Sequence, residues 1–117
     1  MPRSKMKDVA LACARAADGK KGEDVLVLDV RKSSPVADYL VIVTALSRPH
    51  MQALEDEIEE RLLETGLPLH HRSRPQTDQW RVLDYGGVLV HLMREEAREL
   101  YQLERLNEGA KEVSWRS

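Results

Sequence analysis

The chain has 117 residues, of which 42% are hydrophobic and 32% are charged. This length fits one domain that can bury a core without disulfides or metals, and the composition excludes a disordered chain. The 18 basic and 20 acidic residues give a net charge of −2, which argues against a protein held mainly by nucleic-acid phosphates.

A single cysteine, Cys13, allows no disulfide within the chain and suits a reducing compartment. No apolar run approaches the roughly 18 residues of a membrane span. The N-terminus is basic, but no signal-type apolar stretch follows it. We therefore expect a cytoplasmic protein with no membrane partner.

The first third of the chain predicts a helix and two strands. Apolar residues from Met6 to Ala17 recur at spacings of three and four, which is one face of a helix. Cys13 lies on that face and is expected to be a small core residue. The runs 25–30 and 39–44 are rich in β-branched residues and predict strands buried on both faces.

The middle of the chain predicts a second helix that begins after Ser47 as its N-cap and ends before Gly66. A weak strand at 67–69 and a basic loop at 70–77 follow, and the loop is either solvated or a local phosphate contact. The core face of the helix is Met51, Leu54, Ile58 and Leu62. Its acidic residues, expected on a solvated face or docked on a basic partner, are Glu55, Asp56, Glu57, Glu59 and Glu60.

The strongest local signal is a hairpin, in which the runs 80–85 and 88–93 flank Gly86 and Gly87. A two-residue loop sets the register, so Leu83 pairs with Val90. One face then carries Arg81, Leu83, Tyr85, Val88, Val90 and Leu92. The other face carries Trp80, Val82, Asp84, Leu89, His91 and Met93.

The second hairpin face mixes a large aromatic residue with charged ones. Asp84 and His91 become diagonal neighbours within reach of each other, and Trp80 lies near Met93. Such a combination is typical of an interface anchor. The alternative is that a helix covers Trp80 and that the Asp84–His91 pair satisfies only itself.

The last part of the chain predicts a short helix at 94–104, followed by a flexible tail at 108–117 in which Trp115 has no assigned place. The order of elements predicts one α/β domain over residues 1–107. We expect a mixed sheet with flanking helices, in which the hairpin is antiparallel and the earlier strands run parallel across the second helix.

Motifs for catalysis are missing, because the sequence has neither a Gly-rich phosphate loop before a helix nor a cysteine cluster for zinc. The best enzymatic alternative is metal-dependent nucleotidyl transfer, which needs two carboxylates close together on a strand. Asp38 follows Ser33 and Ser34, but Tyr39 and Leu40 stand where the second carboxylate is needed. We therefore expect no catalytic residue, no metal and no cofactor.

Three stretches resemble the Iojap or ribosomal silencing factor family: ADYLVIVT at 37–44, WRVLDYGGVLVH at 80–91 and RELYQLERL at 98–106. The resemblance implies a two-layer, nucleotidyltransferase-like fold without the catalytic carboxylates. It also implies a translation repressor that binds the large ribosomal subunit, chiefly its fourteenth protein, and blocks association with the small subunit.

The resemblance further implies a homodimer when the chain is free. With the large subunit as partner, the basic loop at 70–77 offers a minor contact with ribosomal RNA. A scaffold that uses the Trp80 face only for self-association is a third hypothesis. The sequence departs from the family at Ala45-Leu46, where Gly-Asn is usual, at Gly87, where Asp is common, and at Asn107, where Trp is common. The partner-binding residues expected from the resemblance and the hairpin pattern are Trp80, Asp84, Tyr85, Gly86, His91, Tyr101, Leu103 and Glu104.

Overall fold

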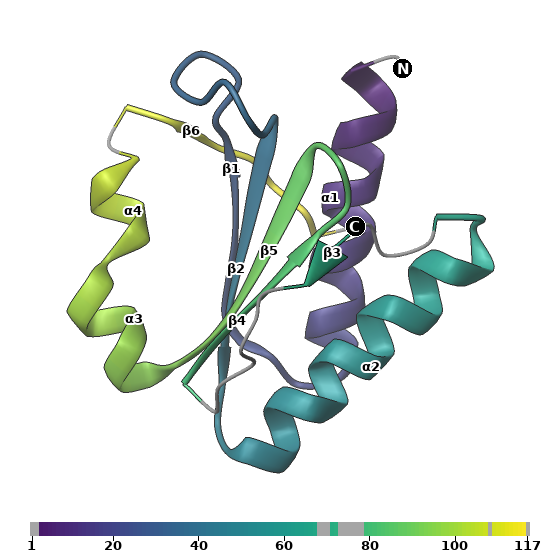
Figure 1. Cartoon of the computed structure of the whole chain (residues 1–117), viewed down its shortest axis with the longest axis vertical. Helices are drawn as coiled ribbons and strands as arrows, with labels where there is room; N and C mark the ends of the chain where they lie inside the picture. Colours follow the sequence, from purple (N-terminus) through teal and green to yellow (C-terminus); the bar gives the residue numbers. More distant parts are fainter. Residues whose placement is uncertain (1–2, 68–70, 73–78, 108, 117) are drawn as a thin grey trace.

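A computed structural model describes residues 3–67, 71–72, 79–107 and 109–116 (Figure 1). The described strands form one mixed sheet in the order β3-β4-β5-β2-β1-β6. The elements are α1 (Arg3–Gly19), β1 (Glu23–Asp29), β2 (Tyr39–Ala45), α2 (Arg48–Glu64), β3 (His71–Arg72), β4 (Trp80–Asp84), β5 (Val88–Arg94), α3 (Glu95–Tyr101), α4 (Leu103–Leu106) and β6 (Lys111–Glu112).

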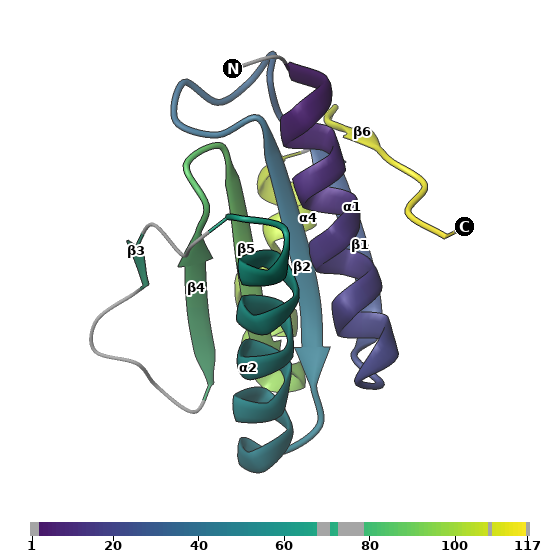
Figure 2. The ribbon, with the colours of Figure 1, turned by 90° about the vertical axis from the view of Figure 1, so that its right-hand side faces the viewer.

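The long helices α1 and α2 lie side by side on one face of the sheet, as Figure 2 shows. Ser47 caps α2 as predicted, because its hydroxyl accepts a hydrogen bond from the amide of His50 at 3.1 Å. The predicted core face of α2 is buried. The apolar side chains of α1, Cys13 among them, complete this larger core.

The shorter helices α3 and α4 cover part of the opposite face of the sheet (Figure 1). Strand β2 is buried along its whole length because it lies between the two cores. The predicted α/β architecture, a mixed sheet with flanking helices, is confirmed.

Only part of the expected strand direction is right. Strand β2 runs parallel to β5, and α2 makes the crossover between them. Strand β1, however, pairs antiparallel with β2, with Val27 opposite Val41. The turn at 30–38 brings the chain straight back, where the amide of Val30 bonds to the carbonyl of Asp38 at 2.9 Å.

One acidic residue of α2 is not on a solvated face. Glu55 is 1% exposed, and its Oε1 lies 3.1 Å from Nη1 of Arg81 on β4. The same nitrogen donates to Gln52 at 2.7 Å. The expectation of a solvated Glu55 is wrong because Arg81, on the predicted buried face of the hairpin, supplies a partner charge.

The C-terminal segment is docked, so the expected flexible tail is wrong for residues 111–116. Strand β6 pairs antiparallel with β1, and the amide of Val113 donates to the carbonyl of Val27 at 2.8 Å. Trp115 is 7% exposed, and its indole donates to the carbonyl of Val25 at 3.0 Å. Nε of Arg15 on α1 in turn donates to the carbonyl of Trp115 at 2.8 Å.

Two predictions fall mostly outside the described residues. These are the weak strand at 67–69 and the basic loop at 70–77, of which the structure describes the backbone of Leu67 and of β3. Strand β3 extends the sheet by pairing His71 with Asp84 on β4. Among the described helices, none is long and apolar enough to cross a membrane.

Candidate partner-binding face

The β4–β5 hairpin has the predicted register, with Leu83 opposite Val90 and Arg81 opposite Leu92. Gly86 supplies the positive φ of the turn, at 85°. The carboxylate of Asp84 accepts a hydrogen bond from the amide of Gly86 at 2.7 Å. Asp84 therefore shapes the turn.

The imidazole of His91 is bonded to Trp80. Nε1 of the indole donates to Nδ1 of His91 at 2.9 Å, and the ring centroids are 5.8 Å apart. Burial lowers the pKa of His91 to about 4, so the ring is neutral near pH 7 with Nδ1 as its acceptor. The predicted Asp84–His91 contact is wrong. The carboxylate of Asp84 accepts a hydrogen bond from the amide of Gly86 in the turn, and the imidazole of His91 accepts one from the indole of Trp80.

Tyr101, the last residue of α3, also packs against the indole of Trp80. Its ring centroid lies 4.7 Å from that of Trp80, at a tilt of 42°. Tyr101 is 49% exposed and Leu100 is 75% exposed, whereas Trp80 is half-buried. The indole is thus held in place but not sealed in the core. We call the surface formed by Trp80, Val82, Leu89, His91 and Tyr101 the Trp80 face; Leu100 precedes Tyr101 on α3.

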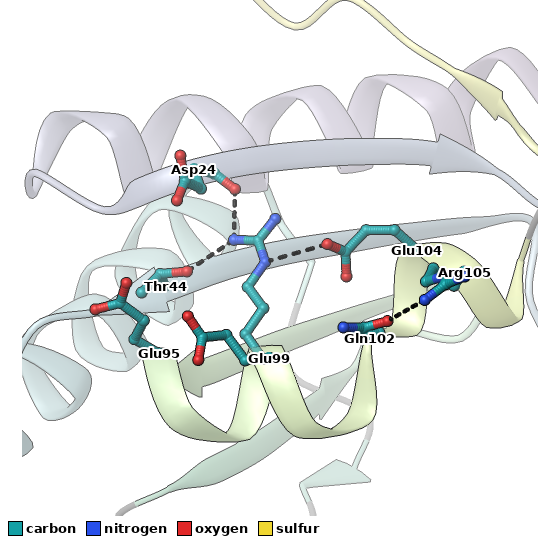
Figure 3. Close-up of a pocket in the computed structure, with 8 residues that line it drawn as sticks. Asp24, Thr44, Glu95, Glu99, Gln102, Glu104 and Arg105 are labelled. Atoms are coloured by element: carbon teal, nitrogen blue, oxygen red, sulfur yellow. Dashed lines mark hydrogen bonds and ion pairs between the residues drawn. The ribbon is translucent and has the colours of Figure 1, made fainter.

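Arg98 ties the short helix α3 to the sheet. It lines a hollow whose other residues, among them Asp24, Thr44 and Glu104, are labelled in Figure 3. Its Nη1 donates to the carbonyl of Asp24 at 2.6 Å and to the hydroxyl of Thr44 at 2.8 Å, and its Nε lies 3.8 Å from Glu104. Burial lowers the pKa of Arg98, and the charges of Glu104 and Asp24 oppose that shift. Arg98 therefore helps to place Tyr101 against Trp80.

Sequence reasoning gave Arg98 no role, although it opens the third family-like stretch. An arginine in the middle of a seven-residue helix reads as a solvated residue. Its acceptors are a backbone carbonyl on β1 and a hydroxyl on β2, which are 74 and 54 residues away. Only the fold brings them together.

The other predicted site residues have different places. Leu103 is buried in the core under α3 and α4, and Glu104 is half-buried beside Arg98. Tyr85 is buried on the opposite face of the sheet, in the core under α1 and α2. Gly86 is exposed at the hairpin turn. The structure thus brings Trp80, His91 and Tyr101 together, whereas Leu103 lies in the core and Glu104 lies beside Arg98.

Gly87, one of the departures from the family pattern, lies under α1. A Cβ atom at this position would be 2.5 Å from Sδ of Met6. The carbonyl of Gly87 also accepts the amide of Asp38 at 2.7 Å, which fastens the loop before β2 to the hairpin turn. The departure is therefore accommodated by a methionine that fills the space above it.

The enzymatic alternative finds no further support in the described residues. Within residues 3–67, 71–72, 79–107 and 109–116, no group of three or more His, Cys, Asp or Glu side chains is arranged to hold a metal ion. Cys13 is fully buried, and burial raises the pKa of its thiol.

A family model described as "Ribosomal silencing factor during starvation" matches residues 3–116. The chain belongs to the ribosomal silencing factor family. The match extends beyond the three stretches, and it includes the docked C-terminal segment with Trp115.

Members of this family from distant bacteria are similar to the chain over most of its length. The ribosomal silencing factor RsfS of Treponema pallidum is 38% identical over 99 residues, which are 83% of this chain and 87% of that protein. The one from Haemophilus influenzae is 36% identical over 89 residues, 76% of this chain and 87% of its own length. A crystal structure of a Chromobacterium violaceum protein has a TM-score of 0.80 at 25% identity, over 97% of this chain and 92% of that one.

Proposed function

We propose that this chain binds the large ribosomal subunit, chiefly its fourteenth protein, and represses translation by blocking association with the small subunit. Membership of the ribosomal silencing factor family supports a ribosomal partner. The mechanism is steric exclusion in the cytoplasm, with no covalent step and no cofactor. The free chain is proposed to be a homodimer.

The Trp80 face carries this proposal. It offers a half-buried indole in contact with the exposed ring of Tyr101, and the exposed Leu100 precedes Tyr101 on α3. Protein interfaces favour aromatic and apolar anchors of this kind. The bond to His91 fixes the indole before binding. A side chain that is already ordered loses less conformational entropy when a partner covers it.

The predicted site residues divide into contacts and supports on this proposal. Trp80 and Tyr101 touch the partner, and Gly86 and Asp84 form the rim at the hairpin turn. Leu103 belongs to the core against which Trp80 packs, and Glu104 lies beside Arg98, which ties α3 to the sheet. Tyr85 supports the hairpin from the core on the other side of the sheet.

Cosedimentation with isolated large subunits tests the proposal. Trp80→Ala is expected to weaken binding by about 30-fold, which corresponds to roughly 2 kcal/mol for an interface hot spot. Leu100→Ala is also expected to weaken binding. Its matched control is Leu63→Ala on α2, because Leu63 is 64% exposed but lies away from the Trp80 face.

Circular dichroism should show the same fold for all three variants. If Trp80→Ala and Leu100→Ala bind like the Leu63→Ala control, the Trp80 face is not the docking surface. With excess small subunits present, the wild-type chain should also reduce the fraction of joined ribosomes. Light scattering of Trp80→Ala distinguishes the proposal from the scaffold hypothesis. If the Trp80 face serves only self-association, this variant is a monomer and still binds large subunits.

A further inference from the structure

A charged surface lies at the end of strands β1 and β2 that is opposite to the end where Trp80 lies. The strand register places Trp80 in the same cross-strand row as Thr44, and places Asp29 in the row of Tyr39. These rows are five residues apart on β2, which is roughly 17 Å along the strand. Trp80 and this charged surface therefore lie at opposite ends of the strands, and β5 and β2 separate β4 from β1.

Four exposed basic side chains gather at this second end, and we call them the basic end: Lys7 on α1, Arg31 and Lys32 after β1, and Lys111 on β6. They line two hollows that adjoin at Asp29, Arg31 and Lys111. Among the described residues that line the two hollows, the acidic ones are Asp29 and Glu112, and Asp38 is also close enough to act on the charge of Arg31. The described lining residues thus carry a positive charge, although the whole chain is at −2.

Arg31 is fixed in place at the basic end. Its Nε and Nη2 donate to the two carboxylate oxygens of Asp29 at 2.9 and 2.7 Å, and its guanidinium carbon lies 5.6 Å from the ring centre of Tyr39. This bidentate pair does not use Nη1. Arg31, and to a smaller extent Lys111 opposite Asp29 on β6, lower the pKa of the Asp29 carboxyl. The negative charge of Asp29 is therefore balanced by Arg31, and the ammonium groups of the basic end, on Lys7, Lys32 and Lys111, are exposed to solvent.

We propose that the basic end is a second contact of this chain with the ribosome and binds the phosphate backbone of ribosomal RNA. This inference rests on the proposed function. The hollows are lined mainly by charged and small polar residues, and their largest apolar member, Tyr39, is buried. They lack the exposed aromatic anchor that a protein partner would use. A preorganised guanidinium beside flexible ammonium groups suits phosphate oxygens.

The C-terminal segment places one of these cations. Lys111 stands opposite Asp29 because β6 pairs with β1, and the buried Trp115 holds that segment in place. The RNA contact therefore depends on the docked segment, which links it to a part of the chain far from the Trp80 face.

The test compares two double variants that remove the same charge. Lys32→Gln with Lys111→Gln neutralises the basic end, and Lys20→Gln with Lys21→Gln neutralises a lysine pair after α1, at the other end of the sheet. Binding to isolated large subunits is measured from about 50 to about 200 mM salt. Loss of two phosphate contacts should reduce the slope of log K against log salt by roughly 1.5. The control should keep the wild-type slope.

Binding to the isolated fourteenth protein separates the possible failures. Both double variants are expected to bind it like the wild type. A basic-end variant with the slope of the control would overturn the RNA contact and leave the proposed function standing. Weaker binding of that variant to the isolated protein would mean a protein contact and would also overturn it. If the wild type binds no large subunits at all, the proposed function itself is wrong.

Discussion

The indole of Trp80 donates its hydrogen to Nδ1 of His91, so the most prominent side chain of the Trp80 face is held by a group that must stay neutral. A protonated imidazole has no acceptor nitrogen and would leave the indole N–H without this partner. The ring of Tyr101 also contacts the indole. Acidification is therefore expected to act on this face first through His91.

The pKa of about 4 for folded His91 predicts how stability changes with pH. Because the unfolded chain has the ordinary value near 6.5, it takes up a proton first as the pH falls. Relative to its value above pH 6.5, the free energy of unfolding therefore decreases as the pH falls toward 4, by up to about 3 kcal/mol from His91. Denaturant unfolding of wild type and His91→Gln should show this difference across that window. A difference that stays flat with pH would contradict it.

The ion pair between Arg81 and Glu55 is buried, with 9% and 1% of the side chains exposed. Arg81→Met alone should cost about 3–5 kcal/mol of unfolding free energy, because it leaves a buried carboxylate without its partner charge. Adding Glu55→Leu should recover much of this loss, since the cost of burying the charges disappears with both. A double-mutant cycle by urea unfolding measures the coupling. Additive losses would show that the pair is not coupled.

Trp115 should contribute strongly to stability although it lies near the end of the chain. Trp115→Ala removes a buried indole and its bond to Val25, which should cost about 3–5 kcal/mol. Arg116→Ala is the matched control, because Arg116 is exposed and stacks on the outside of Trp115. Hydrogen exchange of the Val113 amide should speed up only in Trp115→Ala. Equal protection in both variants would mean that β6 stays docked without the indole.

The contact between Gly87 and Met6 predicts a cost that depends on the methionine. Gly87→Ala should destabilise the chain by about 1–3 kcal/mol, because the new Cβ overlaps Sδ of Met6. In a Met6→Ala background the same substitution should cost much less. Gly19→Ala, where the nearest atom is 3.9 Å away, serves as the unhindered control. Thermal unfolding of these variants measures the loss of stability in each. If Gly87→Ala costs the same stability in the wild-type and Met6→Ala backgrounds, the overlap with Met6 is not the cause.

The sequence predicted what depends on local signals. Gly86 and Gly87 between two apolar runs determine the hairpin and its register, and Ser47 determines where α2 begins. These features need only neighbours within a few residues. The placing of Trp80 on a half-open face follows from the same register, because side chains alternate along a strand.

What the sequence could not predict depends on partners far along the chain. Glu55 looks solvated until Arg81, 26 residues later, is found beside it. Asp84 and His91 are within reach of each other in the register, but a closer backbone amide and an indole take their hydrogen bonds. Trp115 looks like part of a loose tail because its acceptor is 90 residues earlier. The position of Trp80 on the hairpin could therefore be predicted from the sequence, and the hydrogen bonds that hold it could not.

The docked C-terminal segment has a consequence for self-association. A strand at the border of a sheet exposes carbonyls that can recruit a strand from another molecule, which is a common route to aggregation. On β1 the carbonyls of Val25 and Val27 are already occupied, by the indole of Trp115 and the amide of Val113. Two copies of this chain therefore cannot merge their sheets along this stretch of β1, and any pairing there must use side chains.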